Sequence, residues 1–162
     1  MLSDPLHPAV VHFPIAIAVL LPFAAALGAG AIAANALDGR AWVGIVLLHA
    51  VGAGTAWFAE ETGHEQEERV ERALGERIEA PLHEHEENAE RLVLAFGATF
   101  LLTAAGLLRG RAGRLARGGA VTGAAVVGLL SVPTGESGGA LVYEHGAAEA
   151  YVKAQGEAPP TP

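Results

Sequence analysis

The sequence contains no cysteine. This absence excludes disulfides, thiolate zinc sites, iron–sulfur clusters, c-type haem attachment and thiol nucleophiles together. A bound metal ion would therefore need histidine, carboxylate or backbone oxygen ligands. Basic residues are also scarce, because the 162 residues include 10 Lys and Arg against 18 Asp and Glu. A chain with this balance has no broad basic field, so we expect no nucleic-acid partner.

Charge of either sign is scarce as well. Only 17% of the residues are charged, whereas 51% are hydrophobic, and the mean hydropathy is +0.35. A water-soluble domain carries about a quarter charged residues. The apolar content excludes general disorder. We therefore expect apolar surface that faces lipid.

Long apolar runs are present, and crossing the hydrocarbon core of a bilayer takes about 20 such residues in a helix. The runs are Val10–Leu37, Ala41–Ala59, Leu92–Leu108 and Gly118–Tyr143. The sequence thus predicts an all-α protein, an integral membrane four-helix bundle that forms a single domain over residues 1–150. We expect residues 151–162 to be a disordered C-terminal tail.

The charged residues divide between the two sides of this predicted bundle. Four arginines without an acid fall in the predicted loop between the third and fourth helices: Arg109, Arg111, Arg114 and Arg117. Residues 60–91, between the second and third helices, instead hold twelve Glu against four Arg. Because basic loops stay in the cytoplasm, both termini and the acidic segment are predicted to be periplasmic, at a bacterial inner membrane.

The acidic segment has a helical pattern of its own. Apolar residues recur at helical spacing at Val70, Ala73, Leu74 and Ile78. Residues 64–81 are therefore expected to form a short amphipathic helical hairpin that lies on the membrane surface or caps the bundle. We expect a break near Gly75 and an end at Pro81. A solvated charged connector is the alternative.

Histidines and glutamates gather at the predicted periplasmic ends of the helices. Ionisable groups in membrane helices cost several kcal/mol unless they have an interior partner, so this layer indicates a functional site. We expect simple exposure to water for His7, His83 and Glu84. His49 lies alone in the other half, so we expect a core histidine bonded to a backbone or hydroxyl group.

Two kinds of cofactor site fit this layer. A b-type haem needs two facing imidazoles, and the available pairs are His12 with His85, or His64 with His145. A metal site needs mixed ligands, and Glu61-x-x-His64 has the i,i+3 spacing of carboxylate-bridged centres. The candidate metal ligands are Glu60, Glu61, His64, Glu86 and Glu136. No catalytic residue is predicted, and a purely structural hydrogen-bond network is the alternative.

Two motifs resemble those of one bacterial membrane-protein family, domain of unknown function 2231. Residues 7–14 (HPAVVHFP) resemble its opening HP-x-x-VHFP signature, and residues 138–146 (GGALVYEHG) resemble its closing GG-x-LVY-x-HG motif. The resemblance covers nearly the whole chain and implies four apolar segments. It points to His7, His12 and His145 as candidate site residues. Some members are joined to cytochrome-type domains, which by analogy implies a redox role.

The leading prediction is an electron-transfer component of the membrane with haem b or a divalent metal ion as its cofactor. Its expected partners are the lipid bilayer and a respiratory or redox membrane complex, and it could also form a homo-oligomer. One alternative is a structural or accessory subunit without a cofactor. Another is a small metal or ion transporter component, with Glu136 beside the Pro133 break as the ion-handling point.

Overall fold

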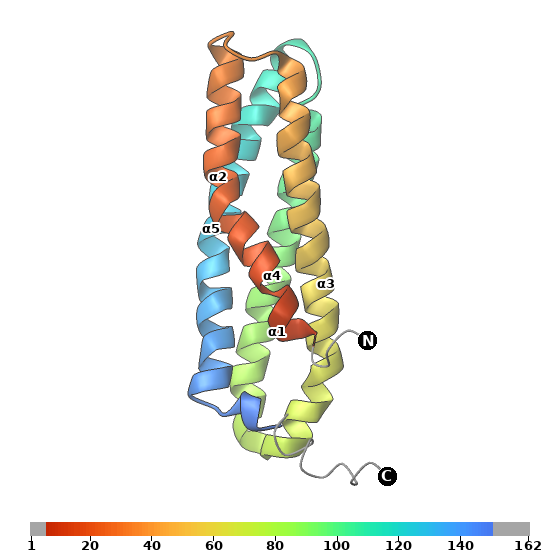
Figure 1. Cartoon of the computed structure of the whole chain (residues 1–162), viewed down its shortest axis with the longest axis vertical. Coiled ribbons are helices and arrows are strands. Elements are labelled where there is room, and N and C mark those ends of the chain that lie inside the picture. The colour runs from red at the N-terminus through yellow and green to blue at the C-terminus, as the bar shows by residue number, and fades with distance from the viewer. Residues whose placement is uncertain (1–5, 151–162) are drawn as a thin grey trace, which may run out of the picture.

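The structure is a computed structural model that describes residues 6–150, and it is a bundle of long helices (Figure 1). The elements are α1 (His7–Val10), α2 (His12–Ala33), η1 (Gly39–Ala41), α3 (Trp42–Leu74), η2 (Gly75–Ile78), α4 (Glu79–Ala105) and α5 (Gly110–Tyr143). Within residues 6–150 there is no strand, which confirms the all-α prediction. The predicted disordered tail, 151–162, lies outside the described residues.

Successive long helices run antiparallel and pack side by side. Helix α4 packs against α3 and α5, and α2 packs against α3 and α5, so the contacts close into a ring. Helix α2 crosses the bundle obliquely, and α1 ends well short of the η2 turn (Figure 1). Consequently, at the end of the molecule that holds η2, α3, α4 and α5 extend beyond α1 and the beginning of α2.

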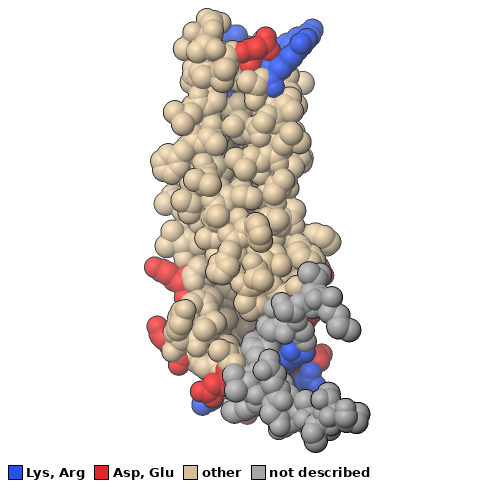
Figure 2. All heavy atoms as spheres, viewed as in Figure 1, with Lys and Arg blue, Asp and Glu red and all other residues tan. Residues whose placement is uncertain are grey.

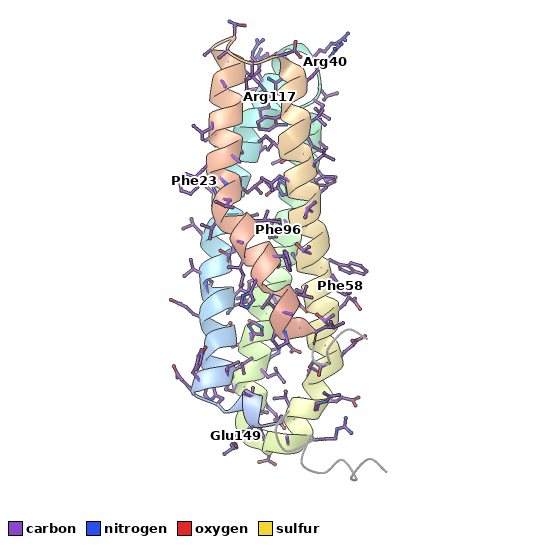
Figure 3. The ribbon with its side chains drawn as sticks, in the orientation of Figure 1. Phe23, Arg40, Phe58, Phe96, Arg117 and Glu149 are labelled. Carbon is purple, nitrogen blue, oxygen red and sulfur yellow. The ribbon has the colours of Figure 1, made fainter. Side chains whose placement is uncertain are left out.

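The middle of the bundle has an apolar exterior. Leu94 and Leu129 are each 72% exposed, and Phe23 is 66% exposed. Figure 2 shows a wide band without charged residues between two charged ends. In Figure 3 Phe23 and Phe58 point outward, whereas Phe96 lies inside. Large apolar side chains in such numbers are compatible with lipid contact and costly in water.

Three helical stretches are long and apolar enough to cross a membrane by length and composition. They are His7–Ala33, Gly39–Ala105 and Gly110–Tyr143. The second stretch reverses direction at η2, so it contains two arms. These stretches support a membrane location.

Small residues let the helices approach closely in the main core. Gly52 on α3 is buried, and a Cβ atom there would lie 2.7 Å from Ile17 Cγ2 and 2.8 Å from Phe96 Cε1. Phe96 itself is fully buried among small residues such as Ala18 and Ala124. Glycine at this position therefore permits α2, α3 and α4 to meet around one aromatic ring.

His49 is a buried hydrogen-bonding residue of this core, with 1% of its surface exposed. Its Nε2 lies 3.2 Å from the Phe96 carbonyl oxygen, and its Nδ1 lies 2.9 Å from Thr103 Oγ1. A carbonyl only accepts, so we assign the proton to Nε2; the Thr103 hydroxyl lies 2.9 Å from both Nδ1 and the Thr99 carbonyl oxygen, which share its single proton. The predicted core histidine, bonded to a backbone and a hydroxyl group, is confirmed.

The acidic segment forms a helical hairpin at the end of the bundle, which is the second of its two predicted placements. The hairpin is not a separate element, because α3 runs unbroken through the segment to Leu74 and α4 begins again at Glu79. The predicted break is present at Gly75, which has a φ of 66°. Pro81 does not end a helix, because it lies in the first turn of α4, where proline needs no donor.

A second apolar cluster explains why these arms stay together. It consists of Val70, Leu74, Ile78, Leu141, Ala147 and Ala150. The apolar residues of the acidic segment face the end of α5, which agrees with the expectation that the segment caps the bundle. The two arms therefore prolong the bundle beyond the first helices.

The basic end also differs in detail. Helix α5 begins at Gly110, so Arg111, Arg114 and Arg117 lie on its first turns and not in a loop. The reason is that residues 111–117 contain no proline and only one glycine between good helix formers. Arg117 Nε donates to the Gly106 carbonyl at 2.8 Å, which ties α5 to the preceding turn. Arg40 and Arg117 lie at the same end of the bundle (Figure 3).

Candidate metal-binding site at the acidic end

A polar layer separates the main core from the second apolar cluster. We define the polar layer as His7, Thr62, Gln66, His85, Asn88, Thr134 and Ser137. These residues come from α1, α3, α4 and α5, and all of them are buried or half-buried. Apolar residues on both sides limit access of water to this layer, so its polar groups depend on one another.

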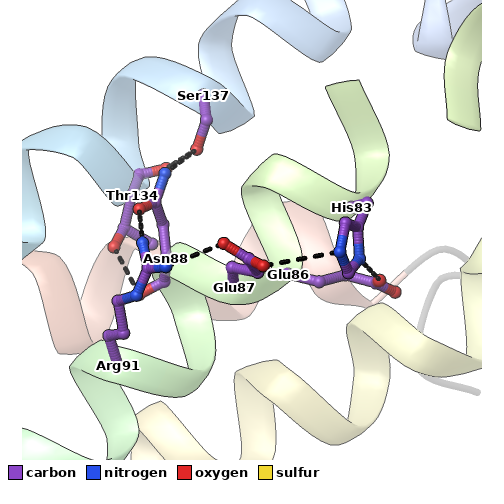
Figure 4. A network of polar contacts seen from close by, with 7 residues as sticks. All are labelled: His83, Glu86, Glu87, Asn88, Arg91, Thr134 and Ser137. Atoms are coloured by element: carbon purple, nitrogen blue, oxygen red, sulfur yellow. Dashed lines mark hydrogen bonds and ion pairs between the residues drawn. The ribbon is translucent and has the colours of Figure 1, made fainter. Parts of the chain in front are cut away.

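Hydrogen bonds between α4 and α5 fix one side of the polar layer (Figure 4). Thr134 Oγ1 donates to the Asn88 carbonyl at 3.1 Å, and Asn88 Nδ2 lies 3.5 Å from Ser137 Oγ. Ser137 Oγ in turn donates to the Thr134 carbonyl at 3.2 Å. Because its single proton is used in this way, the Ser137 hydroxyl is free to accept from a neighbouring ring.

That ring belongs to His85, whose Nδ1 lies 3.0 Å from Ser137 Oγ. His85 precedes the apolar run that begins at Leu92. Burial and then the nearby charge of His7 lower the pKa of His85, while its hydrogen bond with the backbone of Thr134 raises it. The ring is therefore neutral at pH 7.

His7 joins His85 in the polar layer. Its Nδ1 lies 2.8 Å from the Ala59 carbonyl oxygen, and the centres of the His7 and His85 rings are 6.3 Å apart at an interplanar angle of 79°. The prediction that His7 is simply exposed to water is wrong. The ring fits against α3 because Gly63 has no side chain, and a Cβ atom there would lie 3.2 Å from His7 Cε1.

A second group of ligand atoms lies between α3 and α4. One ligand atom from each of His64, Glu67 and Glu86 lies within 4.8 Å of the other two. His64 is exposed, whereas both carboxylates are half-buried. Two of the predicted metal ligands, His64 and Glu86, are thus brought together. The third member is Glu67, three residues after His64, and not Glu61, three residues before it, which is exposed.

The electrostatics of this His64–Glu67–Glu86 cluster favour a positive charge within it. Burial, a hydrogen bond with Glu67 and the charge of Glu67 raise the pKa of Glu86, whereas His64 and His83 lower it. Two carboxylates in contact repel unless a proton or a cation lies between them. His83 lies beside Glu86 and Glu87. Its Nδ1 is 3.9 Å from Glu86 Oε2, and its Nε2 is 3.4 Å from Glu87 Oε1 (Figure 4).

The other predicted ligands lie elsewhere. His12 is exposed on α2, and Glu136 and the half-buried His145 line an open hollow around the end of α5. Glu60 is half-buried on α3 and lies outside the cluster. The nearest ring neighbour of His85 is His7 and not His12, and His64 is grouped with carboxylates and not with His145. Neither predicted haem pair is among the ring contacts found in residues 6–150, so the haem pairs stay a prediction.

Sequence reasoning missed Glu67, and it named His7 as a candidate only through the family resemblance while expecting it to be exposed to water. Glu67 is one of twelve Glu in the acidic segment, and its only distinguishing signal is the i,i+3 spacing from His64. His7 carried a signal in the HPAVVHFP motif, but it precedes the first apolar run. The contact of His7 on α1 with His85 on α4 cannot be read from local spacing along the chain.

Comparisons of the chain with models of protein families, with curated proteins and with solved structures found no match.

Proposed function

We propose that this protein is an integral membrane protein that binds a divalent transition-metal ion between α3 and α4. The observation that carries the proposal is the convergence of His64, Glu67 and Glu86, whose ligand atoms lie within 4.8 Å of one another. One imidazole and two carboxylates form a mixed nitrogen and oxygen set, which suits zinc, manganese or iron(II). An ion of charge +2 would neutralise both carboxylates and remove their repulsion.

The ends of the bundle support an orientation. Basic residues predominate at the end that holds Arg40 and Arg117, whereas at the opposite end acidic residues outnumber the Lys and Arg that are also present there (Figures 2 and 3). We propose four crossings of a bacterial inner membrane, with the arginine end in the cytoplasm and both termini and the metal site in the periplasm. Reporter fusions placed after Arg117 and after Gly75 should then report opposite sides.

The metal alternative has more support than the haem alternative. Each of the four candidate haem ligands lies in a different setting: His12 is exposed, His64 is beside carboxylates, His85 is beside Ser137 and His145 is at the hollow around α5. A redox role for the bound metal, and membership of the family that the two motifs resemble, remain part of the proposal. The likeness of residues 7–14 and 138–146 to the family motifs supports that membership.

Calorimetric titration of the detergent-purified, chelator-stripped protein with Zn²⁺ and Mn²⁺ tests the site. We expect one ion per chain for the wild type. Glu67→Gln and Glu86→Gln each remove one charged ligand, so either should weaken binding by about 100-fold, since even indirect support of a ligand is worth 10 to 100-fold. His64→Asn should do the same.

Glu61→Gln is the matched control, because Glu61 lies three residues before His64 where Glu67 lies three residues after it. It should leave the affinity unchanged. Equal losses in Glu61→Gln and Glu67→Gln would contradict the assigned ligands. A wild type that binds neither ion would favour the accessory-subunit alternative. A Soret band that is lost in His12→Ala and His85→Ala would instead favour haem.

A further inference from the structure

We propose that His7 and His85 form a second metal site, which binds one Cu(I) ion through the two Nε2 atoms. This site lies in the polar layer and shares no ligand with the His64–Glu67–Glu86 cluster. It therefore does not depend on the function proposed above. The feature that carries it is a pair of half-buried imidazoles from distant parts of the sequence, whose ring centres lie 6.3 Å apart.

The same nitrogen, Nδ1, is held by a hydrogen bond in both rings. The His7 Nδ1 must donate, because the Ala59 carbonyl at 2.8 Å can only accept. The His85 Nδ1 donates to Ser137 Oγ, since that hydroxyl uses its own proton on the Thr134 carbonyl. Among residues 6–150 the hydrogen bonds assigned to a ring nitrogen use Nδ1 in both rings, and His85 has a further bond with the backbone of Thr134. Metal-binding histidines have this arrangement, with the second nitrogen held by a carbonyl or hydroxyl group.

The separation of the two rings fits one ion held between them. A nitrogen bound at about 2.0 Å places the centre of its imidazole about 3 Å from the ion, so two rings on opposite sides have centres about 6 Å apart. The observed distance between the centres is 6.3 Å. A tetrahedral angle at the ion would bring the centres to about 5 Å. The distance therefore suits two ligands that lie nearly in line.

The charge of the site selects the ion. Both ligands are neutral imidazoles, and within residues 6–150 neither ring forms an ion pair with a carboxylate. A divalent ion would keep its full double charge in a half-buried place, which costs much more than a single charge. Copper is a metal that imidazole suits, and Cu(I) is singly charged and accepts two donors in line.

An unpartnered acceptor lies on the inner face of α3 at the same end. Gln66 Oε1 is the one buried side-chain nitrogen or oxygen in the described chain without a hydrogen-bond partner. Gln66 follows the buried Thr62 by one turn and precedes the buried Val70 by another, so it belongs to the inward stripe of α3. An unsatisfied oxygen of this kind is consistent with a layer that holds a cation.

Two glycines make room for the rings. A Cβ atom at Gly138 would lie 3.0 Å from His85 Cε1, whereas one at Gly135, on the same helix, would meet nothing within 4 Å. Gly138→Ala should therefore displace the His85 ring slightly without removing it. Gly135→Ala supplies the matched control, since both substitutions add one methyl group to α5.

Anaerobic titration of the full-length protein in detergent with Cu(I), against a coloured Cu(I) chelator, measures the affinity. We expect one Cu(I) per chain, and X-ray absorption should show two nitrogen neighbours. His7→Asn and His85→Asn should each weaken binding by at least about 100-fold, because each removes a direct ligand. Ser137→Ala and Gly138→Ala should each weaken it by about 10-fold.

His12→Asn and Gly135→Ala should leave the Cu(I) affinity unchanged, and so should Glu86→Gln, which separates this site from the cluster. Circular dichroism of each variant shows whether it is folded, and if a histidine variant is not, the Gly138→Ala and Gly135→Ala pair still tests the site. The proposal is overturned if Cu(I) binds equally well to His7→Asn and His85→Asn. It is also overturned if the glycine pair shows no difference, or if Cu(I) binding depends on His64 instead.

Discussion

His49 in the main core and the His7–His85 pair in the polar layer show two uses of imidazole in one bundle. Both ring nitrogens of His49 have partners, at 3.2 Å and 2.9 Å, and its surface is 1% exposed. His7 and His85 each have a partner at Nδ1, and both rings are half-buried. A satisfied histidine joins helices, whereas one that is held in a fixed orientation through Nδ1 can bind through Nε2.

The largest effect on stability is expected when the His49 ring, whose two nitrogens both have hydrogen-bond partners, is removed. His49→Ala should lower the free energy of unfolding by about 3 kcal/mol, because it leaves a cavity beside Phe96 and removes the link between α3 and α4. His7→Ala should cost about 1 kcal/mol, since its ring is only half-buried. Thermal unfolding in detergent measures both. Equal losses would show that the two rings do not differ in role.

The second test concerns the packing that encloses His49. Gly52→Ala should destabilise the protein by about 2 kcal/mol, because the added methyl group meets Ile17 and Phe96. Gly54→Ala is the control: it lies on the same helix with nothing within 4 Å, so it should be neutral or stabilise by up to about 1 kcal/mol. The same unfolding measurement applies. A stabilising Gly52→Ala would mean that α2, α3 and α4 are more loosely packed.

The smallest effect is expected at the acidic end, where Glu86 titrates. Its raised pKa means that the folded state holds the proton more tightly than the unfolded state does. The stability of the metal-free protein should therefore fall as pH rises from the ordinary glutamate pKa to the raised one. Unfolding temperatures in the presence of a chelator, between about pH 4 and pH 8, should show this fall in the wild type and a shallower one in Glu86→Gln. A steeper fall in Glu86→Gln would contradict the assignment.

Local patterns in the sequence predicted much of the fold. Apolar runs separated by glycine and charge predicted the helical class, and the isolated position of His49 predicted its hydrogen-bonded role. The break at Gly75 also followed from the sequence, because glycine readily adopts the positive φ of such a turn. These features depend on residues within a few turns of one another.

Tertiary contacts account for what the sequence left open. The apolar residues Val70, Leu74 and Ile78 give the acidic segment an amphipathic pattern. This pattern is equally typical of a helix on a membrane surface and of a helix that prolongs a bundle. Packing of these residues against Leu141 shows that they prolong the bundle. Pairing of His7 with His85 depends on the fold of α1 against α3, and Glu67 is selected over Glu61 by which face of α3 meets α4. None of these contacts follows from spacing along the chain.

X-ray absorption at the zinc edge tests the His64–Glu67–Glu86 site most directly. Protein loaded with one Zn²⁺ per chain should show a shell of nitrogen and oxygen at about 2.0 Å, with the outer-shell scattering of one imidazole. That imidazole signal should disappear in His64→Asn and persist in His12→Asn. An imidazole signal that survives in His64→Asn would contradict the account, because the ion would then be bound somewhere else.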